Sequence, residues 1–251
     1  MKQSDRRAGL LRINWSTVIA LCLLTPAIVA AQSISFGIRG YAETKDTFFP
    51  TVTPFPPSSP GGGFYQFHAF LNRYSIGPTV EMTLPRSFAV QFDALRSRLE
   101  YREEFFSSSP SSFGSLDDKL DTVGHSWQFP LIAKYYIETD KKMLRPYPEV
   151  GFSFRRVDGI TKYVDTGSSF LCNPVPVSCG TTVYTGTYPS RDILRPWTKG
   201  IVFGGGVDIR WLHFHLQPEL RYTRWLKQAF GPFVKSNMNA LDLVVGFTFG
   251  K

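Results

Sequence analysis

The chain has 251 residues, a formal net charge of +8, 15% aromatic residues and 19% charged residues. Disordered chains are poor in aromatic residues and rich in charge, so this composition predicts a folded chain. A mean hydropathy of −0.11 excludes a bundle of membrane-spanning helices, because each such helix needs about 20 consecutive apolar residues. The three cysteines are too few for a disulfide scaffold or a cysteine-rich zinc module. The basic residues are dispersed, so no nucleic-acid partner is expected.

Residues 1–31 are predicted to be a secretory signal peptide. Four basic residues precede an uncharged apolar stretch over 15–30, and the small residues Ala30 and Ala31 suit a signal peptidase. The alternative is an N-terminal membrane anchor, for which the apolar stretch is short. Cleavage after Ala31 would leave residues 32–251 as a single domain.

Alternation of apolar and polar residues with a period of two recurs eight times in this domain. In residues 74–84, for example, Tyr74, Ile76 and Val80 alternate with Ser75 and Thr79. Such alternation is typical of β-strands with one apolar face. The predicted strands cover 33–41, 74–84, 87–95, 126–138, 148–156, 200–211, 213–223 and 239–249.

The predicted connections alternate between short and long. Short turns join the second strand to the third, the fourth to the fifth and the sixth to the seventh. The other connections are long and polar, or rich in Pro, Gly and Ser, over 43–63, 103–124, 158–199 and 227–237. We therefore predict an all-β fold, an eight-stranded antiparallel up-and-down transmembrane β-barrel with short periplasmic turns and long extracellular loops.

Alternation alone does not say whether the apolar face meets lipid or encloses a cavity, as in a soluble lipocalin-like barrel. Every predicted strand carries a charge on its polar face, and both signs occur. In a narrow eight-stranded barrel such charges can pair and fill the lumen. The predicted lumen charge network consists of Arg39, Glu81, Asp93, Lys134, Glu149, Arg155, Asp208, Arg210, Glu219, Arg221 and Asp242.

Three stretches, YSIGPTVEMTLP at 74–85, FAVQFDAL at 88–95 and LDLVVGFTF at 241–249, resemble the outer-membrane protein beta-barrel domain family of small eight-stranded bacterial barrels. The resemblance implies a location in the outer membrane of a Gram-negative-type bacterium. It also implies insertion by the barrel-assembly machinery, whose signal in this family is a terminal aromatic residue. Phe249 matches that signal, although Gly250 and Lys251 follow it.

Pro78, Pro130 and Pro218 lie inside predicted strands. Proline donates no ladder hydrogen bond and is usually confined to strand edges, strand starts and bulges. We therefore expect bulges or register shifts at these three positions.

Cys172 and Cys179 would reach an oxidising compartment, where a disulfide is expected and two free thiols are the alternative. His213 and His215 share a strand face and could chelate a metal, but no third ligand is evident. His125 and Ser126 are adjacent on a strand, so they point to opposite faces and cannot act as a catalytic pair. No catalytic residue, metal or cofactor is therefore predicted.

Two further motifs have structural interpretations. The run Gly204-Gly205-Gly206 lacks the Lys-Ser/Thr of a phosphate loop and indicates a kink or close packing within a strand. Arg155 and Arg156, near the base of a long connection, are also candidates for contact with solvent or lipid headgroups.

These observations favour a non-enzymatic outer-membrane protein with a structural or surface-interaction role. The expected partners are outer-membrane lipid and an unknown extracellular molecule that contacts the long connections. A narrow, porin-like channel for small solutes is the main alternative. A soluble lipocalin-like binder and a lipid-modifying enzyme are further alternatives.

Overall fold

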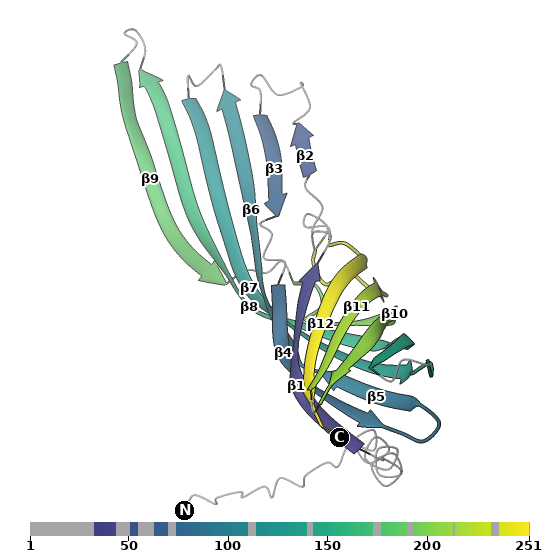
Figure 1. Ribbon diagram of the computed structural model, residues 1–251. Coiled ribbons are helices and arrows are strands. Elements are labelled where there is room, and N and C mark those ends of the chain that lie inside the picture. The colour runs from purple at the N-terminus through teal and green to yellow at the C-terminus, as the bar shows by residue number, and fades with distance from the viewer. Residues whose placement is uncertain are drawn as a thin grey trace, which may run out of the picture.

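A computed structural model gives the fold (Figure 1). It describes residues 33–43, 51–54, 63–69, 74–109, 114–139, 143–172, 177–189, 193–212, 214–231 and 236–250. For some residues at the strand tips, Cys172 and Cys179 among them, the description covers the backbone alone. Within these ranges, no helix has the length and apolar character needed to cross a membrane.

The described residues form twelve strands, and all pairings between them are antiparallel. They are β1 (Ser33–Glu43), β2 (Thr51–Pro54), β3 (Gly63–Ala69), β4 (Tyr74–Thr83), β5 (Phe88–Asp93), β6 (Leu95–Ser109), β7 (Gly114–Tyr135), β8 (Leu144–Cys172), β9 (Val177–Pro189), β10 (Trp197–Trp211), β11 (Phe214–Trp225) and β12 (Asn239–Phe249).

The barrel wall has eight strands. β5 and β6 count as one of them, because they are two halves of one strand interrupted at Ala94. Going round the barrel, β1 pairs with β4, β4 with β5 and β6, and these with β7. The circle continues through β8, β10, β11 and β12 and returns to β1. The predicted closed eight-stranded antiparallel barrel is therefore confirmed.

The apolar face of the barrel points outward. Phe152 is 61% exposed and Ile38 is 59% exposed, whereas Arg39, the neighbour of Ile38 in sequence, is 0% exposed. On β4, β7, β11 and β12, outward apolar side chains occupy alternate positions over nine residues, namely 74–82, 127–135, 214–222 and 241–249. A tilted transmembrane strand needs about 9–11 residues, so the apolar band matches the thickness of a bilayer core.

The short turns lie where the sequence predicts them. Residues 84–87 join β4 to β5, with Arg86 and Ser87 both in the left-handed region at φ 64°. Two successive residues at positive φ are typical of the tight turns that match the twist of a hairpin. Similarly short connections join β7 to β8 and β10 to β11.

At the opposite end of the barrel, several strands continue well beyond the apolar band (Figure 1). We call this part the outer sheet: β2, β3, β9 and residues 100–109 of β6, 114–123 of β7 and 160–172 of β8. Its strand order is β2-β3-β6-β7-β8-β9.

The outer sheet corrects the predicted loops at 103–124 and 158–199, most of which are strand. Beyond the apolar band, polar residues occur on both faces of the sheet, as in the run Asp117-Asp118-Lys119. Without a lipid-facing side, the apolar alternation that marks the other strands is lost. The polar composition of these strands therefore resembles that of loops, and the prediction of loops here is wrong.

The predicted bulges at the three prolines are wrong. The β4 register is the same on both sides of Pro78, since Thr79 pairs with Asp93 and Ile76 with Arg96. Instead of shifting the register, Pro78 on β4 and Pro130 on β7 flank the strand interruption at Ala94.

The register is likewise unchanged across Pro218. The described residues shift register at two other places. One is in the β7–β8 pairing, between Val123 and His125, opposite Gly159, a glycine at φ 63°. The other is in the β8–β9 pairing, between Phe170 and Leu171.

An apolar cluster lies on the inner side of the wall, where the barrel meets the outer sheet. Phe230 and Ala229, from the segment between β11 and β12, are fully buried in it. The Phe230 ring meets the Tyr101 ring edge-on at 6.3 Å. The Ala229 carbonyl accepts hydrogen bonds from the backbone N–H groups of Leu194 and Arg195 at 2.9 and 3.0 Å, which ties this segment to the residues just before β10. We call the cluster the cap cluster; its members are Phe67, Leu99, Tyr101, Val157, Ile160, Ala229 and Phe230.

Candidate functional site

The centre of the barrel holds a network of buried charges arranged around Glu219 of β11. Its carboxylate accepts hydrogen bonds from Lys134 at 2.9 Å, Arg221 at 2.7 Å and Tyr147 at 2.5 Å, and it also pairs with Arg39. The donors come from four strands, β7, β11, β8 and β1. Alternation points each of these side chains into the lumen, because each stands on the polar face of its strand.

Glu81 of β4 closes the network on one side. It accepts hydrogen bonds from Lys134 at 3.2 Å and from the Tyr136 hydroxyl at 2.5 Å. Lys134 also donates to the Gln217 side-chain oxygen at 3.1 Å. The Lys134 ammonium thus has three polar acceptors and is buried.

Asp93 closes the network on the other side. Its carboxylate accepts hydrogen bonds from Tyr41 at 2.8 Å, Thr79 at 2.6 Å, Gln91 at 2.6 Å and Arg221 at 3.3 Å. Asp93 is the last residue of β5, beside the interruption at Ala94, and the proline-flanked break therefore lies directly beside this acceptor.

Arg221 links the two sides of the network. Besides Asp93 and Glu219, it donates from Nε to Glu149 at 2.9 Å. Three cations, Arg39, Lys134 and Arg221, therefore meet four carboxylates. The hydroxyl groups of three tyrosines and one threonine supply further donors, which suits the excess of carboxylates.

Glycines make room for these long side chains. A Cβ atom on Gly246 would lie 3.0–3.1 Å from the guanidinium of Arg39. One on Gly204 would lie 2.5 Å from a carboxylate oxygen of Glu149. The close packing predicted for the triple glycine run thus has a physical cause, the bulk of the charged side chains inside a narrow barrel.

Two of the predicted residues lie apart from this centre, together with His215. Asp208 accepts a hydrogen bond from Arg210 at 2.9 Å, and its other oxygen lies 2.9 Å from Nδ1 of His215. This group is near the short turn between β10 and β11. Gln217 connects it weakly to the centre, at 3.5 Å from Asp208.

Arg155 is buried but is not joined to the central network. Its Nε donates to Thr198 at 3.3 Å, and its guanidinium lies 4.3 Å from the centre of the Trp225 ring. Arg156, the next residue, points outward. Only Arg156 can therefore contact lipid headgroups, and the interpretation of Arg155 as such a contact is wrong.

Asp242 completes the predicted set. It stands opposite Arg221 on β11 and opposite Glu43 on β1 in the strand register. One of its oxygens is buried without a hydrogen-bond partner.

The predicted lumen charge network did not include its uncharged members. They occupy inward positions of the same strands, so strict alternation from a charged neighbour would have found them. They are Tyr41, Thr79, Gln91, Tyr136, Tyr147 and Gln217.

The outer sheet has polar contacts on both faces. On its inner face, Glu103 accepts hydrogen bonds from Lys162 at 2.5 Å and from Tyr65 at 2.7 Å. On its outer face, Arg102 binds both oxygens of Asp121 at 2.6 and 2.9 Å. These hydrogen bonds raise the pKa of the Arg102 guanidinium above its usual value.

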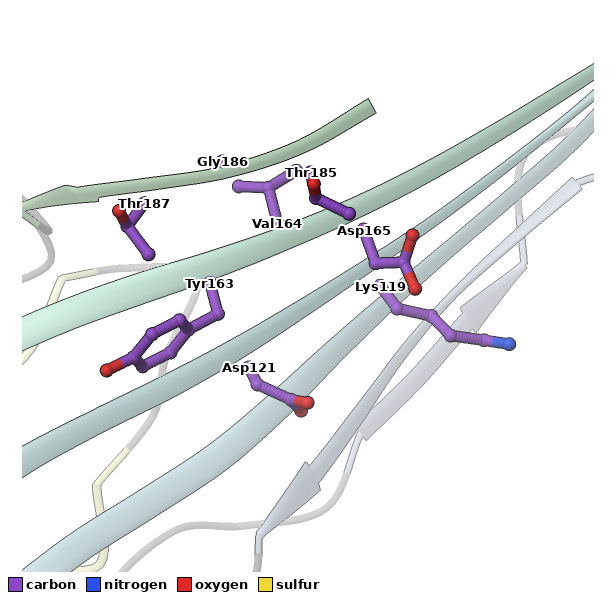
Figure 2. A pocket seen from close by; sticks show the side chains of 8 residues that line it. All are labelled: Lys119, Asp121, Tyr163, Val164, Asp165, Thr185, Gly186 and Thr187. Carbon is purple, nitrogen blue, oxygen red and sulfur yellow. The ribbon is translucent and has the colours of Figure 1, made fainter. Parts of the chain in front are cut away.

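A shallow depression of about 430 Å³ lies on the outer sheet between β7, β8 and β9 (Figure 2). Charged and hydroxyl side chains dominate its lining. The residues are Lys119, Asp121, Tyr163, Val164, Asp165, Thr185, Gly186 and Thr187.

The remaining candidate residues from the sequence are the histidines, Ser126 and the cysteines. No group of three metal-ligating side chains occurs within the described ranges. Ser126 is buried inside the barrel whereas His125 lies on the outer face, opposite Arg98 and Asp158. Residues 1–32, His213 and the side chains of both cysteines lie outside the described part of the chain.

A closed antiparallel barrel with an outward apolar band and an inward charged network defines a transmembrane β-barrel. The outer membrane protein beta-barrel domain family matches residues 63–231, and the chain belongs to this family. The predicted family is thereby confirmed. No curated protein matches the chain.

Among solved structures, the chain is similar to three small outer-membrane barrels. The N-terminal barrel domain of Pseudomonas aeruginosa OprF is 12% identical, with 87% of this chain and 98% of that chain covered and a TM-score of 0.34. Neisserial surface protein A is 13% identical, with 86% and 96% covered and a TM-score of 0.35. The attachment invasion locus protein Ail of Yersinia pestis is 10% identical, with 87% and 97% covered and a TM-score of 0.32.

Proposed function

We propose that this protein is a non-enzymatic outer-membrane barrel whose charged interior plugs the lumen and whose outer sheet contacts molecules outside the cell. The observation that carries the proposal is the extension of the barrel wall into the outer sheet (Figure 1). A barrel that served only to cross the membrane would need no strands beyond the apolar band.

The plug follows from the energetics of the central network. Removing one partner from a buried ion pair costs about 3–5 kcal/mol, because the other charge is left uncompensated. Any solute path through the centre would have to separate Lys134 or Arg221 from Glu219, contacts of 2.9 and 2.7 Å. The cap cluster adds an apolar barrier at the outer end.

The outer sheet offers two kinds of contact surface. One is the polar depression of Figure 2, lined by carboxylates, an ammonium and hydroxyl groups. The other is the free edge of β9, which pairs with β8 alone among the described strands. Val183 and Tyr184 on this strand are 63% and 64% exposed. An unpaired edge presents backbone donors and acceptors to a partner.

The biogenesis that we propose matches this architecture. Residues 1–31 direct export, the barrel-assembly machinery inserts the domain, and outer-membrane lipid surrounds the apolar band. A disulfide between Cys172 and Cys179 stabilises the tip of the β8–β9 hairpin, where Cys172 is opposite Val177 in the register.

Single-channel recording in a planar bilayer tests the plug. We expect no steady discrete openings from the purified, refolded protein. Steady openings of uniform size would contradict the plug and favour the channel.

Shortening the β8–β9 hairpin tests the surface role. Lys162 lies opposite Tyr188, so replacing residues 163–187 by Asn-Gly removes most of the depression lining and closes the hairpin in register with a two-residue turn. Cells that display the full chain and cells that display the shortened chain are compared for binding to immobilised glycans and extracellular-matrix proteins. The matched control is Cys172→Ser with Cys179→Ser, which keeps the hairpin length.

We expect the full chain to bind at least one probe and the shortened chain to lose that binding at equal surface amounts. Binding by neither chain, or equal binding by both, would contradict the surface role. Migration of unboiled samples on gels verifies that each variant is folded.

A further inference from the structure

A row of alternating arginine and tryptophan crosses four neighbouring strands on the outside of the barrel. In the strand register, Arg96 of β6 is opposite Trp127 of β7, Trp127 is opposite Arg156 of β8, and Arg156 is opposite Trp197 of β10. Directly opposed residues in a sheet have neighbouring side chains on the same face. The four side chains therefore form one continuous strip, which we call the Arg-Trp row.

Ring contacts hold the row together. The Arg96 guanidinium lies 5.8 Å from the centre of the Trp127 ring, and that of Arg156 lies 5.7 Å from Trp197. The Phe129 ring stacks at 6.2 Å from Trp127 and at 6.3 Å from Trp197. A guanidinium over an aromatic face is stabilised by the ring quadrupole and keeps its hydrogen-bond donors free for another partner.

The row lies where the outward side chains change from apolar to charged. On β8, Phe152 and Phe154 precede Arg156 and Asp158 follows it; on β7, the outward residues change from Leu131 to Asp121 across Trp127. Tryptophan is enriched at the boundary between membrane and water. Because the outer sheet lies beyond the row, the row faces the outer leaflet.

The row carries excess positive charge. Arg156 pairs with Asp158 at 3.3 Å, but Arg156 is 52% exposed and such pairs are weak. Arg96 has no ion pair among the described residues. Lys199 is the next outward-facing residue after Trp197 on β10, on the side of the apolar band. Its ammonium adds a further cation and lies 5.9 Å from the centre of the Phe154 ring.

We propose that the Arg-Trp row binds the phosphorylated headgroup of an outer-leaflet lipid. Arg96 and Arg156 bind its phosphate oxygens through paired N–H donors, the geometry that guanidinium groups favour. Trp127, Trp197 and Phe129 contact the glycan or upper acyl region of the same lipid. The inference rests on the proposed membrane location but not on the plug or the surface role.

The test measures binding of diphosphorylated lipid A to the full-length folded protein in detergent micelles. Dephosphorylated lipid A, phosphatidylcholine and inorganic phosphate serve as competitors. The variant is Arg96→Gln with Arg156→Gln. The matched control is Arg86→Gln with Arg210→Gln, which removes the same charge near the short turns at the opposite end of the barrel.

We expect the row variant to bind lipid A at least about tenfold more weakly, since one hydrogen bond to a charged group accounts for about a tenfold change or more. The control should stay within about twofold of the wild type, a change of less than 0.5 kcal/mol. Dephosphorylated lipid A, phosphatidylcholine and inorganic phosphate should each compete poorly.

Equal affinity of the row variant and the wild type would overturn the proposal. Equally strong competition by inorganic phosphate would also overturn it, because the site would then bind a free anion. Both side chains of the variant are exposed, and heat-dependent gel migration shows whether it remains folded. Channel activity in a bilayer would contradict the proposed plug and leave the lipid site unaffected, so the two failures are distinguishable.

Discussion

Replacing Glu219 by Gln removes one charge from the centre of the barrel while keeping the shape of the side chain. Glu219 accepts hydrogen bonds from Lys134, Arg221 and Tyr147 and pairs with Arg39. Because Gln creates no cavity, the change in stability reports the lost charge together with the loss of one acceptor, since the amide NH2 of Gln replaces an oxygen that accepts a hydrogen bond.

The expected loss in the free energy of unfolding depends on which carboxylates remain near each cation after the substitution. Lys134 and Arg221 retain carboxylates at 3.2 and 2.9 Å. Among the described residues, Arg39 retains Asp93 at 3.6 Å and Glu81 at 3.9 Å, both beyond hydrogen-bond distance. Arg39 therefore loses its closest carboxylate but keeps these two longer ion pairs and its hydrogen bond to Gln217. We expect a loss of about 3 kcal/mol, the lower end of the range for breaking a buried ion pair.

Urea unfolding from lipid vesicles, followed by tryptophan fluorescence, measures this loss. The control is Arg210→Gln, whose side chain is 39% exposed and pairs with Asp208 at 2.9 Å near the short turns. An ion pair with an exposed partner contributes about 0–1 kcal/mol. A free energy of unfolding for Glu219→Gln within 1 kcal/mol of the wild type would refute the view that the central charges depend on one another.

Three other substitutions test other parts of the fold by the same unfolding measurement. Phe92→Arg places a charge on the outward face and should cost about 2–4 kcal/mol if the position is at the bilayer midplane. The control, Val183→Arg on the outer sheet, should change stability by less than about 0.5 kcal/mol. Similar effects at both sites would show that Phe92 does not face lipid. Phe230→Ala empties the centre of the cap cluster and should cost about 3–5 kcal/mol, and a neutral result would mean that the cap contributes nothing to stability. Gly246→Val pushes against the Arg39 guanidinium and should cost about 1–3 kcal/mol through overpacking; an unchanged midpoint would show that Arg39 can move freely.

Alternation was sufficient to predict the barrel wall, because lipid imposes an apolar side chain at every second position. In β12, Leu243, Val245 and Phe247 point outward, while Asp242 and Val244 point inward. The same rule identifies the inward charges by position. It does not identify which charges meet, because Glu219 and Lys134 are 85 residues apart in sequence and are brought together by barrel closure.

The rest of the structure lacked a periodic signal. The outer sheet has polar residues on both faces, so its strands resemble loops in composition. The cap cluster depends on Phe230, which lies in a connection between strands and follows no alternation. Its position is set by tertiary contacts with Tyr101 and by the backbone hydrogen bonds of Ala229, neither of which a single sequence reveals.

The continuous run of β8 from the bilayer into the outer sheet would set the distance from the membrane at which the proposed extracellular partner is met. From Arg156 to Cys172 the strand extends about 50 Å, at about 3.3 Å per residue. A tip carried on paired strands keeps a nearly constant stand-off, whereas a tip on a loose loop would sample many heights. Under the proposed surface role, the protein would act as a spacer of set length, and its targets would be those that come within that one distance of the membrane.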